Sequence, residues 1–216
     1  MVEESEDQEA EFDRTSEHEG ERIDTAGMML RVKEQLRRYE GWVNHMYLDT
    51  KGNITVGVGF LLPKSEVGFY SWRYKATKRS APLVSAQADW FEVSKQFYGP
   101  SRTAAFYDAY TTVELSDATI GFVLTKKLLK LRDDLKGNFD DADITFDDLP
   151  PTLQEAMFDM GWNVGAGFIN GDWPKLRAAL RVGDWGTAAR ESHRKLPVPE
   201  TRNTEIRELI ESAGHE

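Results

Sequence analysis

The clearest regular alternation of apolar and polar positions lies near the start of the chain. Apolar residues recur there at three- and four-residue steps and form one stripe, which predicts a helix over residues 28–39. The stripe consists of Met29, Val32, Leu36 and Tyr39. Asp24-Thr25 offers an N-cap for this helix, and Gly41 is suited to the left-handed conformation that commonly follows a last helical turn.

A strand pattern follows the helix. Residues 45–48 predict a short strand, residues 49–53 have turn chemistry in which Gly52 and Asn53 tolerate positive φ, and residues 54–61 predict the return strand of a hairpin. The strand period of two puts Thr55, Gly57 and Gly59 on one face. Glycines on a strand face are typical of a close approach by another backbone or a ligand. We therefore expect a cleft over this face, with Asp49 at its rim and Thr55 in its wall.

Two carboxylic acids in this stretch stand in contrasting settings. Glu40 ends the predicted helix, where the negative end of the helix dipole favours the protonated acid. Asp49 opens a solvated turn and should stay ionised. One acid that holds a proton and one that stays ionised is the usual pair for cleaving a glycosidic bond. The ordinary alternatives are a solvated glutamate, an aspartate that caps a turn and, at Thr55, simple strand propensity.

The joint pattern resembles a known family. Residues 40–62 read E-G-x5-Y-x-D-T-x-G-x2-T-x-G-x-G-x-L-L, which is similar to the signature of the phage-type lysozymes, glycoside hydrolase family 24. The resemblance implies Glu40 as the general acid, Asp49 as the carboxylate that assists the incoming water, and Thr55 as a hydroxyl that helps to place it. The family often has a histidine where this chain has Phe60, and we expect that departure to affect local stability rather than catalysis.

The same resemblance suggests further substrate contacts. Within the matched stretch these are Gly57, Gly59 and Leu61. In the second half of the chain, shorter matches such as LSD, M-G-x4-A-G-F-x-N and GDW-x2-A-A follow in the family order, and they imply sugar contact by Phe158 and an approach of Arg202 to Glu40. The ordinary alternatives are a core position for Phe158 and a surface position for Arg202.

The rest of the chain reads as mostly helical. Residues 63–82 are polar and turn-rich and predict an irregular segment, and residues 138–149 predict an acidic loop. Ser116 is a candidate N-cap for the strongest of the remaining helices. The predicted helices cover residues 84–98, 104–110, 116–135, 152–161, 173–181, 184–194 and 201–213. The helix over 84–98 has Ala88, Phe91 and Val93 as its apolar stripe, and the helix over 152–161 has Leu153, Ala156, Met157 and Met160 facing inward.

Composition narrows the possible functions. The 216 residues include no cysteine, which excludes thiol catalysis, and the four histidines show no metal-ligand spacing, so we expect neither a metal nor a cofactor. Residues 1–26 carry 11 acidic and 2 basic side chains and predict a disordered tail or linker, whereas residues 27–216 are almost neutral. Without a basic footprint we expect no nucleic-acid partner. No apolar run has the length of a membrane span, and no signal peptide opens the chain.

These features predict an α+β fold dominated by helices, with residues 27–216 forming one monomeric, lysozyme-like domain. A small hairpin lobe and a helical lobe should enclose a cleft. The resemblance implies an enzyme, a muramidase that hydrolyses the β-1,4 bond between N-acetylmuramic acid and N-acetylglucosamine in peptidoglycan, with inversion at the anomeric carbon. Inversion requires carboxyl groups about 6.5–9.5 Å apart rather than about 5 Å. A lytic transglycosylase and an inactive wall-binding module are the alternatives.

The biological setting has two alternatives at this stage. A lytic enzyme without a signal peptide fits a phage endolysin released through a holin, or an antibacterial effector of a type VI secretion system. In either case it would act on the wall or in the periplasm of the target bacterium. An effector would have an immunity protein and a secretion-machine carrier as partners.

Overall fold

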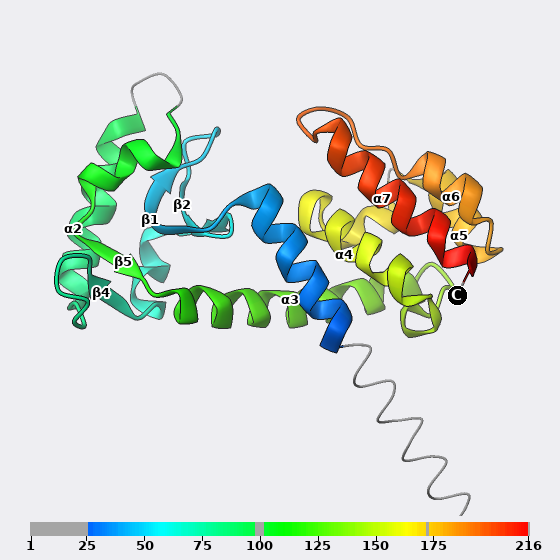
Figure 1. The fold of residues 1–216 in the computed structure, drawn as a ribbon, viewed down its shortest axis with the longest axis horizontal. Coiled ribbons are helices and arrows are strands. Elements are labelled where there is room, and N and C mark those ends of the chain that lie inside the picture. The colour runs from blue at the N-terminus through cyan, green and yellow to red at the C-terminus, as the bar shows by residue number, and fades with distance from the viewer. Residues whose placement is uncertain (1–25, 98–101, 172, 216) are drawn as a thin grey trace, which may run out of the picture. The chain divides into compact units, whose positions relative to one another are not determined.

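The computed structural model describes residues 26–97, 102–171 and 173–215, and it is predominantly helical, with small antiparallel sheets (Figure 1). The predicted α+β class is thus confirmed. The chain divides into two compact units. We call residues 36–128 the hairpin unit, and residues 26–35 with the described part of 129–216 the helical unit. The predicted acidic tail and the Asp24-Thr25 cap lie outside the described residues, except for residue 26.

The first helix covers residues 26–40, close to the prediction. Its buried apolar stripe is Met28, Val32 and Leu36, so Met28 takes the place predicted for Met29, and Tyr39 is only partly buried. Gly41 ends the helix with a φ of +81°, and its N–H donates to the carbonyl of Arg37 at 3.1 Å. The predicted left-handed cap is therefore confirmed, and it fixes Glu40 as the last residue of the helix.

The predicted hairpin is a three-stranded antiparallel sheet, β1 (Val43–Leu48), β2 (Ile54–Gly57) and β3 (Phe60–Leu61), in that spatial order. The single return strand of the prediction was wrong, because the chain turns at Gly57–Gly59 and both glycines have positive φ. Asn53 also departs from the prediction, since Gly52, but not Asn53, has a positive φ in the turn. The register places Tyr47 opposite Thr55 and Thr55 opposite Leu61.

A second sheet in the hairpin unit was not predicted. It pairs β4 (Trp72–Tyr74), within the segment expected to be irregular, with β5 (Val113–Leu115). Each strand has only three residues, too few for a visible alternation of polar and apolar positions. The 3₁₀ helices of this unit are η1 (Lys64–Phe69), η2 (Lys95–Phe97) and η3 (Ala104–Tyr110).

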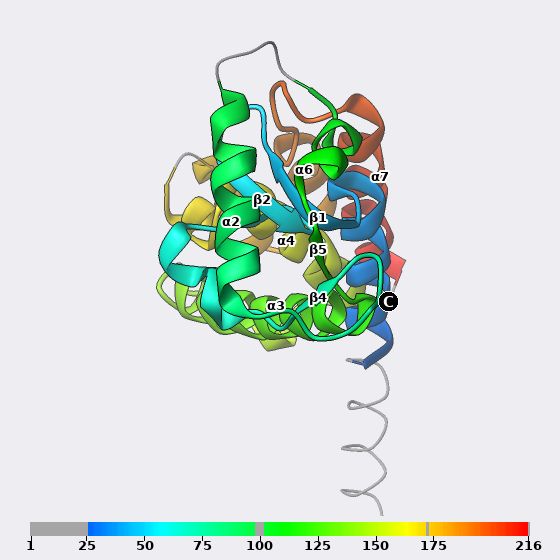
Figure 2. The same ribbon diagram turned by 90° about the vertical axis from the view of Figure 1, so that its left-hand side faces the viewer.

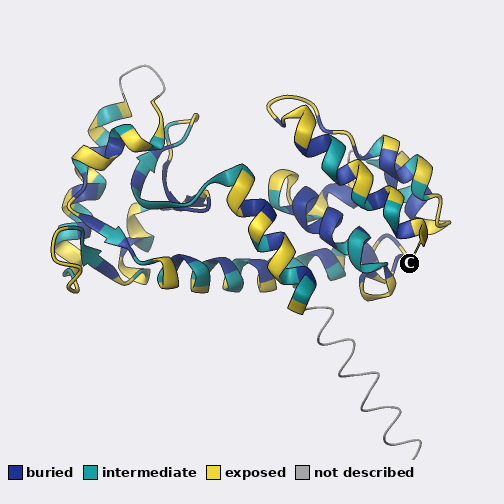
Figure 3. Cartoon of the chain, in the orientation of Figure 1, coloured by how far each residue is buried: buried dark blue, intermediate teal, exposed yellow. Residues whose placement is uncertain are grey.

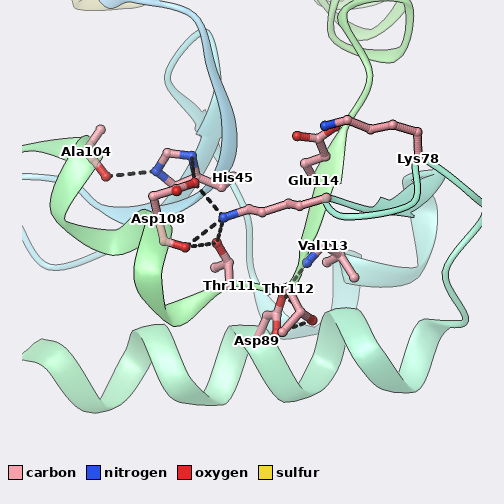
Figure 4. Close-up of polar contacts among 10 residues, drawn as sticks. His45, Lys78, Asp89, Ala104, Asp108, Thr111, Thr112, Val113 and Glu114 are labelled. Carbon is pink, nitrogen blue, oxygen red and sulfur yellow. Dashed lines mark hydrogen bonds and ion pairs between the residues drawn. The ribbon is translucent and has the colours of Figure 1, made fainter.

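Helix α2 (Leu83–Ser94) lies beside β1 and β2, as Figures 1 and 2 both show. Its buried face contains Ala86, Asp89 and Val93, whereas Phe91, an apolar residue of the predicted helix, is exposed. Asp89 is buried because it accepts hydrogen bonds from the backbone N–H groups of Thr112 (2.6 Å) and Val113 (2.8 Å), and it thereby joins α2 to β5 (Figure 4). A polar tether has displaced the apolar stripe expected of this helix.

The helical unit is built around α4 (Pro151–Val164), whose inward residues Leu153, Ala156, Met157 and Met160 are buried as predicted (Figure 3). Helix α3 (Asp117–Asp140) begins in the hairpin unit and ends in the helical unit, and it runs beyond the end expected near residue 135. Its N-cap is Ser116, as predicted, since the Ser116 hydroxyl accepts from the Thr119 N–H at 3.0 Å.

The remaining helices of this unit are short. They are η4 (Phe146–Asp148), η5 (Ala166–Asn170), α5 (Pro174–Arg181), α6 (Trp185–Glu191), α7 (Glu200–Ser212) and η6 (Ala213–His215). The segment expected to be an acidic loop contributes Phe139, Ile144 and Phe146 to the core. Among the described residues, no helix combines the length and apolar character needed to cross a membrane.

Candidate active site

The three predicted catalytic residues all lie in the hairpin unit, on neighbouring elements. Glu40 ends the first helix, Asp49 follows β1 directly, and Thr55 lies in β2. Glu40 and Asp49 are partly exposed, whereas Thr55 is only 4% exposed. A hydroxyl in the wall of an open cleft would be more accessible, so the structure shows Thr55 at the base of the turn rather than on its surface.

The carboxylate of Asp49 is held by the turn that it opens. Its Oδ1 accepts the backbone N–H groups of Lys51 and Asn53, each at 2.8 Å, and its Oδ2 accepts the side-chain amide of Asn53 at 3.1 Å. These donors are two backbone N–H groups and a side-chain amide, so none of them carries a charge, and together they fix the orientation of the carboxyl group. Asp49 is thus both the turn cap of the ordinary alternative and a fixed anion that remains partly accessible.

Glu40 lies beside Gly59. A β-carbon built on Gly59 would come within 3.9 Å of Glu40 Oε2, so this glycine leaves open space next to the carboxyl group. Gly59 is exposed and has a φ of +67°. The predicted bare face of Thr55, Gly57 and Gly59 is therefore not formed as one strand face, and only Gly59 leaves space beside Glu40.

Gly57 has a different role from the one expected. It is buried, and a β-carbon there would lie 2.6 Å from the ring of Phe60. Phe60 is itself 1% exposed, and the ammonium group of Lys127 lies 5.4 Å from the centre of its ring. The ring of Phe60 therefore fills the space that Gly57 leaves, and this packing explains why the residue is a glycine.

Tyr47 joins the two candidate acids electrostatically. Burial, followed by the negative charges of Asp49 and then Glu40, raises the pKa of Tyr47 to about 12. Both carboxylates therefore act on the same phenol, which lies opposite Thr55 in the sheet. Side chains of directly opposed residues share one face of a sheet, so Tyr47, Thr55 and Leu61 form one row across the three strands. The sequence motif contained Tyr47, but its pattern gave no reason to single it out.

Strand β1 is also held by a polar cluster around His45 (Figure 4). His45 Nε2 lies 2.9 Å from the carbonyl oxygen of Ala104 and donates to it, and Nδ1 lies 3.3 Å from the carboxylate of Asp108. Lys75 donates to the same carboxylate at 2.6 Å, and this hydrogen bond is the main reason that the pKa of Asp108 lies below its usual value. The cluster holds the strand that leads into Asp49 against η3.

A cavity of about 440 Å³ lies between the hairpin turn and α2. Leu61, a predicted substrate contact, is 54% exposed and lines this cavity together with Asn53, Trp90 and Phe97. The cavity thus adjoins the Asp49 turn. In the described parts of the chain, no group of three or more histidine, cysteine, aspartate or glutamate side chains is arranged to bind a metal ion.

Phe158 and Arg202 belong to the helical unit, where both have structural partners. Phe158 is fully buried, with its ring centre 6.0 Å from that of Phe146, as the core alternative predicted. Arg202 is 4% exposed rather than on the surface, and its Nε donates to Asp159 Oδ2 at 2.9 Å. Arg194 Nη1 donates to the same carboxylate at 2.6 Å, so Asp159 holds two buried guanidinium groups.

A scan against protein-family models gave no match, and a search of curated proteins gave none either.

Proposed function

We propose that this protein is a peptidoglycan muramidase, with Glu40 as general acid and Asp49 as the carboxylate that activates water. The observation that carries the proposal is the pairing of two unlike carboxyl groups around one tyrosine. Glu40 stands at a helix end beside the space left by Gly59, and Asp49 is an anion oriented by three neutral donors. Both raise the pKa of Tyr47, which places their charges in one electrostatic neighbourhood.

The proposed reaction consumes one water molecule for each bond cleaved. Glu40 donates its proton to the glycosidic oxygen as the bond to the anomeric carbon breaks. Water attacks that carbon from the opposite face and passes a proton to Asp49, and proton exchange with solvent restores both groups. The carboxyl separation expected for inversion, about 6.5–9.5 Å, stays a prediction.

Charge distribution gives further support. The hairpin unit carries 12 lysines and arginines against 8 aspartates and glutamates, a net charge of +4, and the near neutrality of residues 27–216 conceals this excess. A cationic surface attracts anionic polymers such as bacterial walls. We propose the wall or periplasm of a target bacterium as the place of action, reached either as a phage endolysin or as a secreted antibacterial effector with a cognate immunity protein.

Digestion of purified sacculi tests the proposal. Mass spectrometry of the products should show reducing N-acetylmuramic acid ends, because hydrolysis adds water across the bond. The Glu40→Gln variant should lose about 10²–10⁴-fold in rate, the usual contribution of a general acid. Glu92→Gln, an exposed glutamate on α2, is the matched control and should retain full activity.

Two results would replace this function with another. Products with 1,6-anhydro ends would identify a lytic transglycosylase, which needs no water and no role for Asp49. Intact glycan strands after prolonged digestion, together with retention of the protein on sacculi, would identify a wall-binding module.

A further inference from the structure

Asn53 occupies a central position in the hydrogen bonds of the Asp49 turn. Its backbone N–H donates to Asp49 Oδ1 at 2.8 Å, and its side-chain amide donates to Oδ2 at 3.1 Å. It therefore contacts both oxygens of the carboxylate. A carboxylate held at both oxygens cannot rotate about its terminal torsion without breaking one of these bonds.

The carbonyl of Asn53 extends this network to Thr55. It accepts the backbone N–H of Asp49 at 2.9 Å and the hydroxyl of Thr55 at 3.1 Å. Because the Thr55 hydroxyl donates its proton to Asn53, the lone pairs of its oxygen are left to accept from another donor, such as a water molecule. One residue thus contacts both Asp49, which activates water in the proposed reaction, and Thr55, which the resemblance implies helps to place that water.

The contribution of the Asn53 side chain can be separated from that of its backbone. Any residue at this position supplies the N–H and the carbonyl, and the backbone of Asn53 does not need positive φ. Only the 3.1 Å bond to Asp49 Oδ2 requires an amide side chain. Asn53 is also exposed, so replacing its side chain leaves no cavity in the core.

We propose that Asn53 is a positioning residue for the hydrolytic site, which orients the Asp49 carboxylate and, through its carbonyl, the Thr55 hydroxyl. This inference rests on the proposed muramidase function. It assigns a role to a residue that the sequence pattern marked only as part of a turn.

The chain provides a matched comparison for the experiment. Asn44 Nδ2 donates to Asp117 Oδ1 at 2.9 Å, an asparagine–aspartate contact of the same kind in the same unit. This bond is the main reason that the pKa of Asp117 lies below its usual value. Asn44 has a second bond, to the carbonyl of Leu115 at 2.8 Å, so its loss should cost at least as much stability as loss of the Asn53 amide.

The experiment compares Asn53→Ala, Asn53→Asp and Asn44→Ala in the full chain. The rate on sacculi is measured across pH, and the side-chain carboxyl of Asp49 is followed by ¹³C NMR titration. For Asn53→Ala we expect kcat to fall about tenfold, the size expected for one charge-assisted hydrogen bond, with KM unchanged within about twofold. The acid limb of kcat should move to higher pH, because the ionised carboxylate has lost a donor.

The other two variants test whether the shift of the acid limb of kcat has the expected direction and whether it is specific to Asn53. Asn53→Asp places a like charge beside Asp49 and should move the acid limb further in the same direction. Asn44→Ala should lower stability and leave the acid limb and the Asp49 titration where they are in the wild type. Equal pH profiles for Asn53→Ala and Asn44→Ala would overturn the proposal and leave Asn53 a purely structural residue.

Failure of the proposed function would look different. A wild-type protein that releases no fragments from sacculi overturns the muramidase proposal, and the positioning role in catalysis falls with it. The NMR titration needs no turnover, so in that case it still shows whether the Asn53 amide stabilises ionised Asp49.

Discussion

Two aspartates, one in each unit, show how differently this chain uses a carboxylate. Asp159 in the helical unit is fully buried and contacts two buried arginines. Asp49 in the hairpin unit is partly exposed, and its described donors are two backbone N–H groups and an amide. Asp159 is neutralised by its partners, which is typical of a structural ion cluster. Asp49 keeps its charge and its access, which is what a residue that handles water requires.

This comparison also bears on Arg202, for which the resemblance implied an approach to Glu40. Arg202 has a structural partner in Asp159, and its approach to Glu40 stays a prediction. The ion pair with buried Asp159 gives Arg202 a structural role that requires no contact with substrate. The sequence contained no signal for this pair, because Asp159 and Arg202 are 43 residues apart.

The largest expected effect concerns the activity of the hairpin unit. Asp49→Asn keeps the size of the side chain but removes its charge and its ability to take a proton from water. We expect the hydrolysis rate on sacculi to fall about 10²–10⁴-fold, with little change in the urea midpoint. Glu92→Gln again serves as control, and full activity of Asp49→Asn would remove Asp49 from the mechanism.

The next effect concerns stability in the helical unit. Asp159→Asn removes the negative charge that faces Arg194 and Arg202 in the core, and breaking a buried ion pair costs about 3–5 kcal/mol. Urea unfolding followed by circular dichroism measures this loss. Asp148→Asn, at an exposed site on η4, should change stability by less than about 0.5 kcal/mol. Similar losses in the two variants would contradict a special role for Asp159.

A smaller effect is expected at the start of α3. Ser116→Ala removes the hydroxyl that accepts the Thr119 N–H, and loss of such a cap costs about 1 kcal/mol. Ser212→Ala removes a hydroxyl that instead donates to a carbonyl within α7, and we expect a smaller change there. Thermal unfolding of both variants gives the comparison, and an equal shift in Tm would show that Ser116 is not an effective cap.

The smallest effect is a shift in a titration. Loss of either negative charge, in Glu40→Gln or Asp49→Asn, should bring the pKa of Tyr47 down from about 12, whereas the raised pKa of Tyr107, which is due to burial, should not move. Ultraviolet titration measures both, with Tyr47→Phe to assign the signal. A folded-state pKa above the unfolded value of about 10 means that the protonated phenol favours folding. The free energy of unfolding of the wild type should therefore fall as pH rises from about 10 to about 12, because Tyr47 loses its proton more readily in the unfolded chain.

The sequence predicted best those features of the fold that depend on residues close to one another in the chain. The first helix, its Gly41 cap, the Ser116 cap and the inward face of α4 depend on residues within a few positions of each other, and all were confirmed. The inward face of α2 could not be predicted, because Asp89 is buried by partners 23 and 24 residues away. The strands β4 and β5 were also missed, because each has only three residues and the opposed residues Arg73 and Glu114 are 41 positions apart.

The residues of the candidate site also fall into those that the sequence pattern identified and those that only the folded structure shows. Glu40, Asp49 and Thr55 were identified because their spacing matched a motif, and the motif also led to Gly57, whose reason for being glycine is the ring of Phe60. Asn53 was passed over, because hydrogen bonds from one residue to both Asp49 and Thr55 become visible only when the turn is folded. Residue types alone indicate the kind of chemistry, whereas the positioning contacts require coordinates.

Gly52 illustrates a consequence for mutational scanning. It lies in the turn with a φ of +82°, and a β-carbon there would come within 2.0 Å of the ring of Phe97. Every side chain is therefore unfavourable at this position, for steric reasons that do not involve Glu40 or the breaking of a sugar bond. A saturation library scored only by lysis would rank Gly52 beside the acid residues, and a parallel score for protein abundance would tell the two kinds of intolerance apart.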